Sequence, residues 1–237
     1  MRHPGPAVGG ADGCPGGWIL VVRDASGGIG SRVCANAAEL VNAADALAAL
    51  AVDIPIGILD AGARVCDVPA RAALGPRRNS VYPAPVRAAI DATDYRDASD
   101  RSFAAHGKRL SKQAFNIIPK IREMDLALRG DANVAARVHE VHPELSFMLL
   151  NDGVPMPFGK KSTEGRRDRE RSIAREFPNA FADVRARHAR AEAKDDDILD
   201  AFAALWSADR IARGLALHFP EGERAREASG LPMVIKA

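Results

Sequence analysis

The sequence predicts an α/β fold. Three short apolar segments separated by turn residues lie near the N-terminus, and a helix and then a buried strand follow them. A strand that is reached through a helix usually lies parallel to an earlier strand. A long amphipathic helix near the C-terminus is suited to cover one face of such a sheet. Hydrophobic residues make up 47% of the chain but aromatic residues only 5%, so small aliphatic side chains build most of the core.

The first half of the predicted sheet is an antiparallel meander. Its turns contain Pro15-Gly16 and Ser26-Gly27-Gly28, which are typical turn residues. Asn36 with Glu39 three positions later predicts a helix start, and the apolar spacing extends that helix to about Leu50. A buried strand is expected next, because an apolar run there ends at Pro55 and Gly57. The four strands are predicted at Val8–Asp12, Trp18–Arg23, Ile29–Ala35 and Ala51–Ile56.

The remainder is predicted to belong to one domain over residues 1–237. The pattern weakens over residues 59–133, which we interpret as a helical insertion within that domain. The last helix has the clearest apolar face, formed by Leu199, Phe202 and Trp206. The other expected elements are helices at Tyr95–His106 and Ile118–Arg129, a strand at Val134–Val141, and helices at Pro143–Leu150, Ser162–Phe177, Phe181–Arg190 and Asp196–Leu217.

Composition excludes several classes of protein. With 33 basic and 31 acidic residues, the net charge of +2 indicates no particular polyanionic partner. The longest apolar run, residues 46–52, is far shorter than the roughly 20 residues that span a bilayer. The N-terminus lacks the apolar segment of a secretory signal, so we expect a cytoplasmic protein without a membrane partner. The three cysteines have no zinc-ligand spacing and are expected to be buried.

Acidic residues occur at the ends of the predicted strands. Asp12, Asp53 and Glu140 each have apolar neighbours in the sequence. A carboxylate in such surroundings needs a cationic partner, a backbone donor or a metal ion. Each one alone is more simply explained as a turn or cap residue, but three in the same setting favour a shared site.

The last helix begins with a cluster of acids. Acids in a first turn complement the helix dipole, which accounts for part of the cluster. Asp200 lies beyond that turn and shares a face with Asp196 and Asp197. Like charges at 4 Å repel by about 4 kcal/mol at an effective dielectric constant of 20. A divalent cation such as Mg²⁺, which prefers hard oxygen ligands, would compensate for this repulsion.

Several motifs together resemble a known family. They include Gly10-Ala11-Asp12-Gly13-Cys14-Pro15-Gly16-Gly17-Trp18, Val52-Asp53-Ile54-Pro55-Ile56-Gly57, Glu140-Val141-His142-Pro143-Glu144 and Asp196-Asp197-Ile198-Leu199-Asp200-Ala201. With them the chain resembles the domain-of-unknown-function 429 family, which is regarded as a predicted nuclease family with a ribonuclease H-like fold. The resemblance extends from about Val8 to Ile235 and includes Lys160-Lys161-Ser162.

The resemblance implies both a fold and a site. The fold is a mixed five-stranded sheet in the order 3-2-1-4-5, with strand 2 antiparallel and helices on its faces. The catalytic carboxylates would be Asp12, Asp53, Asp197 and Asp200, and Glu140 would lie close to them on the fifth strand.

We therefore hypothesise a metal-dependent nuclease or phosphodiesterase acting on nucleic acid. Asp12, Asp53, Asp197 and Asp200 would hold one or two Mg²⁺ or Mn²⁺ ions at the scissile phosphate. Basic residues in the family motifs or in Arg-rich stretches would contact the phosphate backbone, although a solvated basic surface explains the stretches equally well. These candidates are Arg77, Arg78, Lys120, Lys161 and Arg166.

Two other functions remain open. The first is a catalytically silent module on the same fold that binds nucleic acid or protein. The second is a nucleotide-binding phosphotransferase, because Asp12-Gly13 and the segment around Asp53 faintly resemble the phosphate loops of actin-like ATPases. Those enzymes close two duplicated domains over ATP, and this chain is too short for both. Serine chemistry is disfavoured, because Ser80 and Ser111 lack evident His and Asp partners.

Overall fold

The fold was examined in a computed structural model that describes residues 5–222 and 225–237. A five-stranded sheet has the order β3-β2-β1-β4-β5. The strand β1 pairs antiparallel with β2 and parallel with β4, and β4 pairs parallel with β5. The predicted α/β class and strand order are therefore confirmed. The strands are β1 Val8–Cys14, β2 Gly17–Arg23, β3 Ile29–Cys34, β4 Ala49–Val52 and β5 Val138–Glu140.

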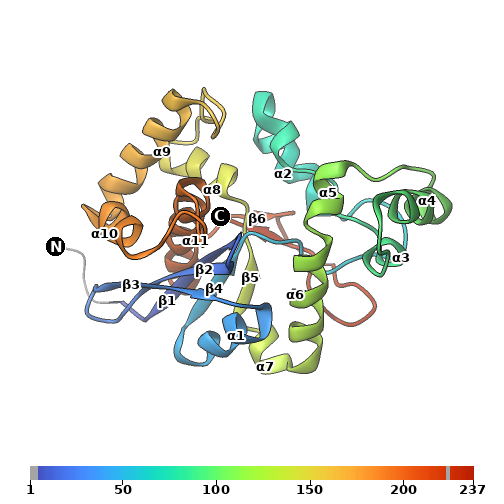
Figure 1. The fold of residues 1–237 in the computed structure, drawn as a ribbon, viewed down its shortest axis with the longest axis horizontal. Helices are drawn as coiled ribbons and strands as arrows, with labels where there is room; N and C mark the ends of the chain where they lie inside the picture. Colours follow the sequence, from blue (N-terminus) through green and yellow to red (C-terminus); the bar gives the residue numbers. More distant parts are fainter. Residues whose placement is uncertain (1–4, 223–224) are drawn as a thin grey trace.

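Helices lie on both sides of the sheet (Figure 1), and a separate apolar core fills each side. On one face, Ile19 and Val21 of β2 pack toward the long helix α11 (Asp195–Ala212) and its neighbours. On the other face, Trp18 and Leu20 pack toward α1 (Ala37–Asn42) and α6 (Ile118–Gly130). Alternate strand residues point to opposite faces, so this division fixes the direction of every β1 and β4 side chain.

Helices between and after the strands complete the fold. Figure 1 shows α3, α4 and α5 in green, extending away from the sheet. A short hairpin of β6 (His218–Phe219) and β7 (Ile235–Lys236) follows α11 and was not predicted. The remaining elements are two 3₁₀ helices, η1 Ala43–Ala46 and η2 Gly75–Ser80, and the helices α2 Asp67–Ala73, α3 Arg87–Ile90, α4 Tyr95–His106, α5 Lys112–Asn116, α7 Ala132–Ala135, α8 Pro143–Leu150, α9 Thr163–Glu176 and α10 Ala180–Arg187.

The fourth strand was predicted at Ala51–Ile56 but spans Ala49–Val52, so Asp53 follows it. Three other predicted boundaries were wrong for identifiable reasons. The helix that begins after Asn36 ends with η1 at Ala46, because Leu50 belongs to β4. The strand predicted from Val134 starts only at Val138, since Asp131 caps a helical turn by accepting bonds from Asn133 and Val134. The last helix ends at Ala212, close to Gly214, which has a left-handed φ of 70°.

Within the residues that the structure describes, no helix is both long enough and apolar enough to cross a bilayer.

Candidate active site

The ends of β1 and β4 bring two aspartates together. Ala11 of β1 pairs with Val52, the last residue of β4, and the Asp53 amide donates to the Ala11 carbonyl at 3.1 Å. Asp12 of β1 and Asp53, the residue that directly follows β4, are thus neighbours at this edge of the sheet. Side chains two residues apart on a strand point to the same face of a sheet. Val8 and Gly10 therefore share a face with Asp12, and Ala49 and Ala51 share a face with Asp53. Val8, Ala49 and Ala51 all belong to the core under α11, so both carboxylates point to the α11 face.

Helix α11 adds a third aspartate from the opposite side. It lies so close to β1 that a Cβ built on Gly10 would be 2.0 Å from the Leu205 amide nitrogen and 2.4 Å from the Ala201 carbonyl oxygen. Glycine therefore permits direct contact between the strand and helix backbones at this point. Asp200, beside Ala201, has a side chain only 3% exposed. The predicted convergence of Asp12, Asp53 and Asp200 depends on this contact.

The charges of the three aspartates act on one another. Burial, and then the charges of Asp53 and Asp200, raise the pKa of Asp12 well above its usual range. Burial raises the pKa of Asp53 to about 6, with Asp200 and Glu144 adding to the rise and His142 and Lys160 opposing it. No arginine in the described ranges pairs with Asp12 or Asp53. The negative charge at this end of the sheet is therefore incompletely compensated.

Lys160 supplies the positive charge that is present. Its Nζ lies 2.6 Å from Oδ2 of Asp200, and its charge also acts on Asp12 and Asp53. The Asp200 carboxylate, more than any other group, raises the pKa of Lys160, which favours the charged form of this side chain. The sequence hypothesis favoured the adjacent Lys161 for substrate contact and did not single out Lys160. Only the folded distance to Asp200 distinguishes the two lysines.

Asp197 lies at the edge of the cluster with a structural role of its own. Its Oδ2 accepts a hydrogen bond of 2.8 Å from the Lys194 amide at the start of α11. Burial is the largest cause that raises the pKa of Asp197, and the charge of Asp200 contributes less. One oxygen therefore caps the helix while its charge still acts on Asp12.

Glu140 does not join the cluster. Arg64 binds both of its carboxylate oxygens, Nη1 to Oε2 and Nη2 to Oε1, each at 2.7 Å, and the Ile56 amide donates to Oε2 at 2.7 Å. Arg64 also bonds Asp67 at 2.6 Å, and all three side chains are buried. We correct the sequence hypothesis here: this carboxylate is held in a buried ion-pair network, and we leave it out of the proposed site.

Two residues of the motif after β5 contribute instead. The buried Glu144 accepts a bond of 2.6 Å from Arg169 through Oε1, while Oε2 has no hydrogen-bond partner among the described residues. Glu144 and His142 both act electrostatically on Asp53. The Nε2 of His142 lies 3.2 Å from the Ser80 carbonyl oxygen. The sequence motif contained both residues, but neither was assigned a role, because their distance from the aspartates depends on how α8 follows β5.

The predicted basic residues occupy different positions. Lys120 lies beside the Asp12 strand, with Nζ 4.8 Å from the Trp18 ring centroid and Cδ 2.8 Å from a Cβ built on Gly13. Arg77 reaches Glu144 at 3.6 Å, and Arg78 is exposed to solvent. Lys161 and Arg166 line a groove of about 330 Å³ that adjoins Asp200. Arg166 is already paired there with Asp195 and with Glu170, each at 2.6 Å.

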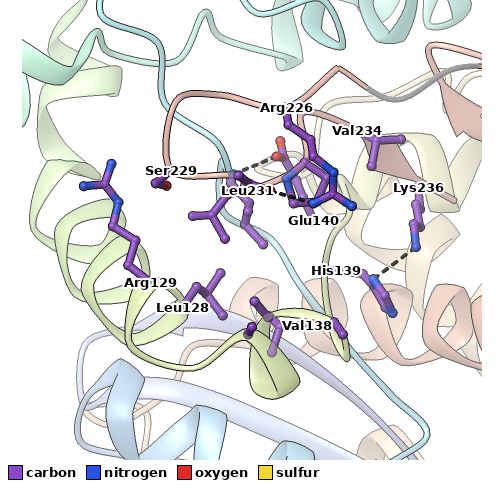
Figure 2. Close-up of a pocket in the computed structure, with 16 residues that line it drawn as sticks. Leu128, Arg129, Val138, His139, Glu140, Arg226, Ser229, Leu231, Val234 and Lys236 are labelled. Carbon is purple, nitrogen blue, oxygen red and sulfur yellow. Dashed lines mark hydrogen bonds between the residues drawn. The ribbon is translucent and has the colours of Figure 1, made fainter.

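A separate cavity of about 400 Å³ lies away from the aspartates (Figure 2). It is bounded by the end of α6, β5 and the C-terminal segment. Figure 2 shows Arg129 and Ser229 at one side and Lys236, bonded to His139 at 3.0 Å, at the other. None of Asp12, Asp53, Asp197 and Asp200 lines it, so it plays no part in the site described here.

The donor set determines which metal could bind. Aspartate oxygens that repel one another suit a hard cation such as Mg²⁺ or Mn²⁺. Among the described residues, no group of three or more His, Cys, Asp or Glu side chains is arranged to hold an ion. Mg²⁺ commonly binds through one or two carboxylates and keeps several waters, so Asp12 and Asp53 fit an open site of that kind. They do not form a closed cage.

The raised pKa of Asp53 predicts a pH-dependent stability. Because folding raises this pKa from 3.8 to about 6, the folded state binds the proton more tightly. Its contribution to stability is therefore present below about pH 4 and is lost as pH rises to about 6, by on the order of 1 to 3 kcal/mol. In metal-free buffer, Asp53→Asn should be more stable than wild type at pH 7.5, with a smaller difference at pH 4.5.

Urea unfolding at the two pH values measures this effect. The exposed Asp60 provides a matched control, because Asp60→Asn should unfold like wild type at both. Equal stability changes for Asp53→Asn at pH 4.5 and 7.5 would show that Asp53 is not a destabilising charge.

The strand order and the carboxylates gathered at the ends of β1 and β4 define an α/β protein with a ribonuclease H-like sheet topology. The chain belongs to the family described as "Protein of unknown function (DUF429)", whose model matches residues 10–225. This match confirms the resemblance inferred from the motifs. No curated protein and no solved structure matches the chain.

Proposed function

We propose that this protein is a Mg²⁺- or Mn²⁺-dependent nuclease. The observation that carries the proposal is the incompletely compensated charge shared by Asp12, Asp53 and Asp200, which come from two strands and a helix. Burying mutually repelling carboxylates costs stability, and such an arrangement is typical of functional sites. A divalent cation would neutralise this charge and would supply positive charge for a phosphate substrate.

The residues of the cluster have different roles in the proposed reaction. Asp12 and Asp53 would hold the ion, and Asp200 holds the Lys160 ammonium. When bound, the metal activates a water and stabilises the charge that develops on the phosphate. Lys120 and Lys161 lie on two sides of the cluster, beside Gly13 and along the groove next to Asp200, where they can receive neighbouring phosphates of a polynucleotide.

Removal of the metal tests the proposal. The purified chain is incubated with single-stranded DNA, duplex DNA, RNA and a four-way junction in Mn²⁺, in Mg²⁺ and in EDTA. We expect cleavage of at least one substrate in Mn²⁺ or Mg²⁺, and a rate at least about 100-fold lower in EDTA that recovers when metal is restored. Cleavage that persists in EDTA would contradict the mechanism. Nucleic-acid binding without cleavage under every metal condition would favour the silent binding module.

A further inference from the structure

The backbone of the loop that carries Lys160 is held by contacts with α9. Lys160 lies in the loop before α9, between Gly159 and the helix cap Ser162. Ser162 accepts a bond from the Gly165 amide, and a Cβ on Gly165 would lie 2.1 Å from the Gly159 carbonyl oxygen. The loop is therefore packed directly against the first turn of α9.

Arg169 of α9 also stabilises the loop that contains Lys160. Its side chain is only 1% exposed and donates to the Phe158 carbonyl at 3.1 Å and to the Gly165 carbonyl at 2.9 Å. Its other guanidinium nitrogen binds Glu144 at 2.6 Å, which connects the loop to α8. The backbone of the loop that carries Lys160 is thus held in place, and the side chain itself, 41% exposed, is fixed at its end by the 2.6 Å ion pair with Asp200.

The charges near Lys160 can be counted. In their ionised forms Asp12, Asp53 and Asp200 carry three negative charges, and Lys160 supplies one positive charge to all three. Glu144 has Arg169 as its own partner, and Asp197 caps α11 through the Lys194 amide. Among the residues that the structure describes, Lys160 is the one cation bonded to this group, and His142 also offsets charge at Asp53, so the ionised aspartates retain net negative charge that one divalent ion would neutralise.

We propose that Lys160 takes the place of a second metal ion in this site. Its ammonium pairs with Asp200, so the site binds one divalent ion, through Asp12 and Asp53. The inference rests on the proposed metal-dependent function and specifies how many ions that function uses. A lysine ammonium carries one positive charge and three hydrogen-bond donors and has no fixed coordination geometry. It can therefore neutralise a carboxylate as a metal ion does, but it cannot activate a bound water.

The test is a calorimetric titration of the full chain with Mn²⁺ alone. Wild type should bind one ion. Lys160→Met leaves Asp200 unpaired, so we expect a second ion, or at least about tenfold tighter binding of the first. Lys161→Met serves as the matched control, since Lys161 is the neighbouring lysine on the same groove and its removal should leave the stoichiometry at one. Lys160→Arg keeps the charge and should also bind one ion.

A double variant protects the test against misfolding. Asp200→Asn combined with Lys160→Met removes the pair without leaving a buried charge, and it should bind one ion with an affinity within about threefold of wild type. Circular dichroism confirms that each variant is folded. Two ions bound to wild type, unchanged binding in a folded Lys160→Met, or loss of binding in the double variant would overturn the inference.

The outcome also separates this inference from the proposed function. One ion bound without cleavage of any nucleic acid would reject the nuclease activity and retain the role of Lys160. Binding of two ions together with cleavage of nucleic acid would reject the role of Lys160 and retain the nuclease activity. Absence of Mn²⁺ binding would reject both.

Discussion

Replacing Glu140 with Gln is expected to destabilise the protein by about 3 to 5 kcal/mol. The substitution removes the charge that Arg64 binds through two hydrogen bonds of 2.7 Å, while Arg64 itself remains 4% exposed. A buried guanidinium that loses its main partner keeps its desolvation cost, and Asp67 compensates only part of it. Urea unfolding at neutral pH measures the loss.

An exposed ion pair provides the comparison. Asp45 lies 3.4 Å from Arg137 with a side chain 70% exposed, so Asp45→Asn should change stability by no more than about 1 kcal/mol. If Glu140→Gln were as stable as wild type and instead lost metal-dependent cleavage, the carboxylate would belong to the catalytic site after all.

Replacing Asp12 with Asn should lower metal-dependent cleavage by at least about 100-fold. Loss of a residue that merely supports a metal ligand typically costs 10- to 100-fold, and a direct ligand costs more. Stability should remain equal or increase, because burial and neighbouring carboxylates already disfavour the Asp12 charge, as its raised pKa shows. Cleavage rates and thermal unfolding of the same preparation give both values.

Stability separates a site residue from a structural one in this experiment. A destabilised and inactive Asp12→Asn would be uninformative about catalysis, whereas a stable and inactive variant supports a direct role. Asp60→Asn, in the exposed loop after β4, should retain wild-type cleavage. Retention of cleavage within about threefold by Asp12→Asn would rule out Asp12 as a metal ligand.

Local signals in the sequence predicted much of the fold. Asn36 accepts a bond from the Glu39 amide at 3.0 Å, as expected for an N-cap, and Glu39 reaches back to accept a bond of 2.9 Å from the Ala35 amide, one residue before the cap. The helix at Tyr95–His106 has the predicted bounds, with Asp94 as its cap and Gly107 in the left-handed conformation at its end. The hairpin of β6 and β7 was not predicted, because strands of two residues are too short to show a pattern.

Side-chain partners were harder to predict than elements. Asp12, Asp53 and Glu140 have similar apolar neighbours in the sequence, yet Glu140 is bound by Arg64 and the two aspartates share an incompletely compensated charge. Arg64 lies 76 positions from Glu140 and Lys160 lies 40 positions from Asp200. Contacts across such separations leave no periodic signal in the chain.

By itself, the sequence determined the secondary structure, the sheet class and the acidic residues available for a site, because capping, turn chemistry and periodicity act over a few neighbouring residues. Only the tertiary structure decided which carboxylates meet. The contact of Gly10 with the α11 backbone brings Asp200 toward the Asp12 strand, and the buried Arg169 binds the backbone of the loop whose Lys160 pairs with Asp200. These arrangements depend on close packing between distant segments, which determines whether each buried charge has a partner.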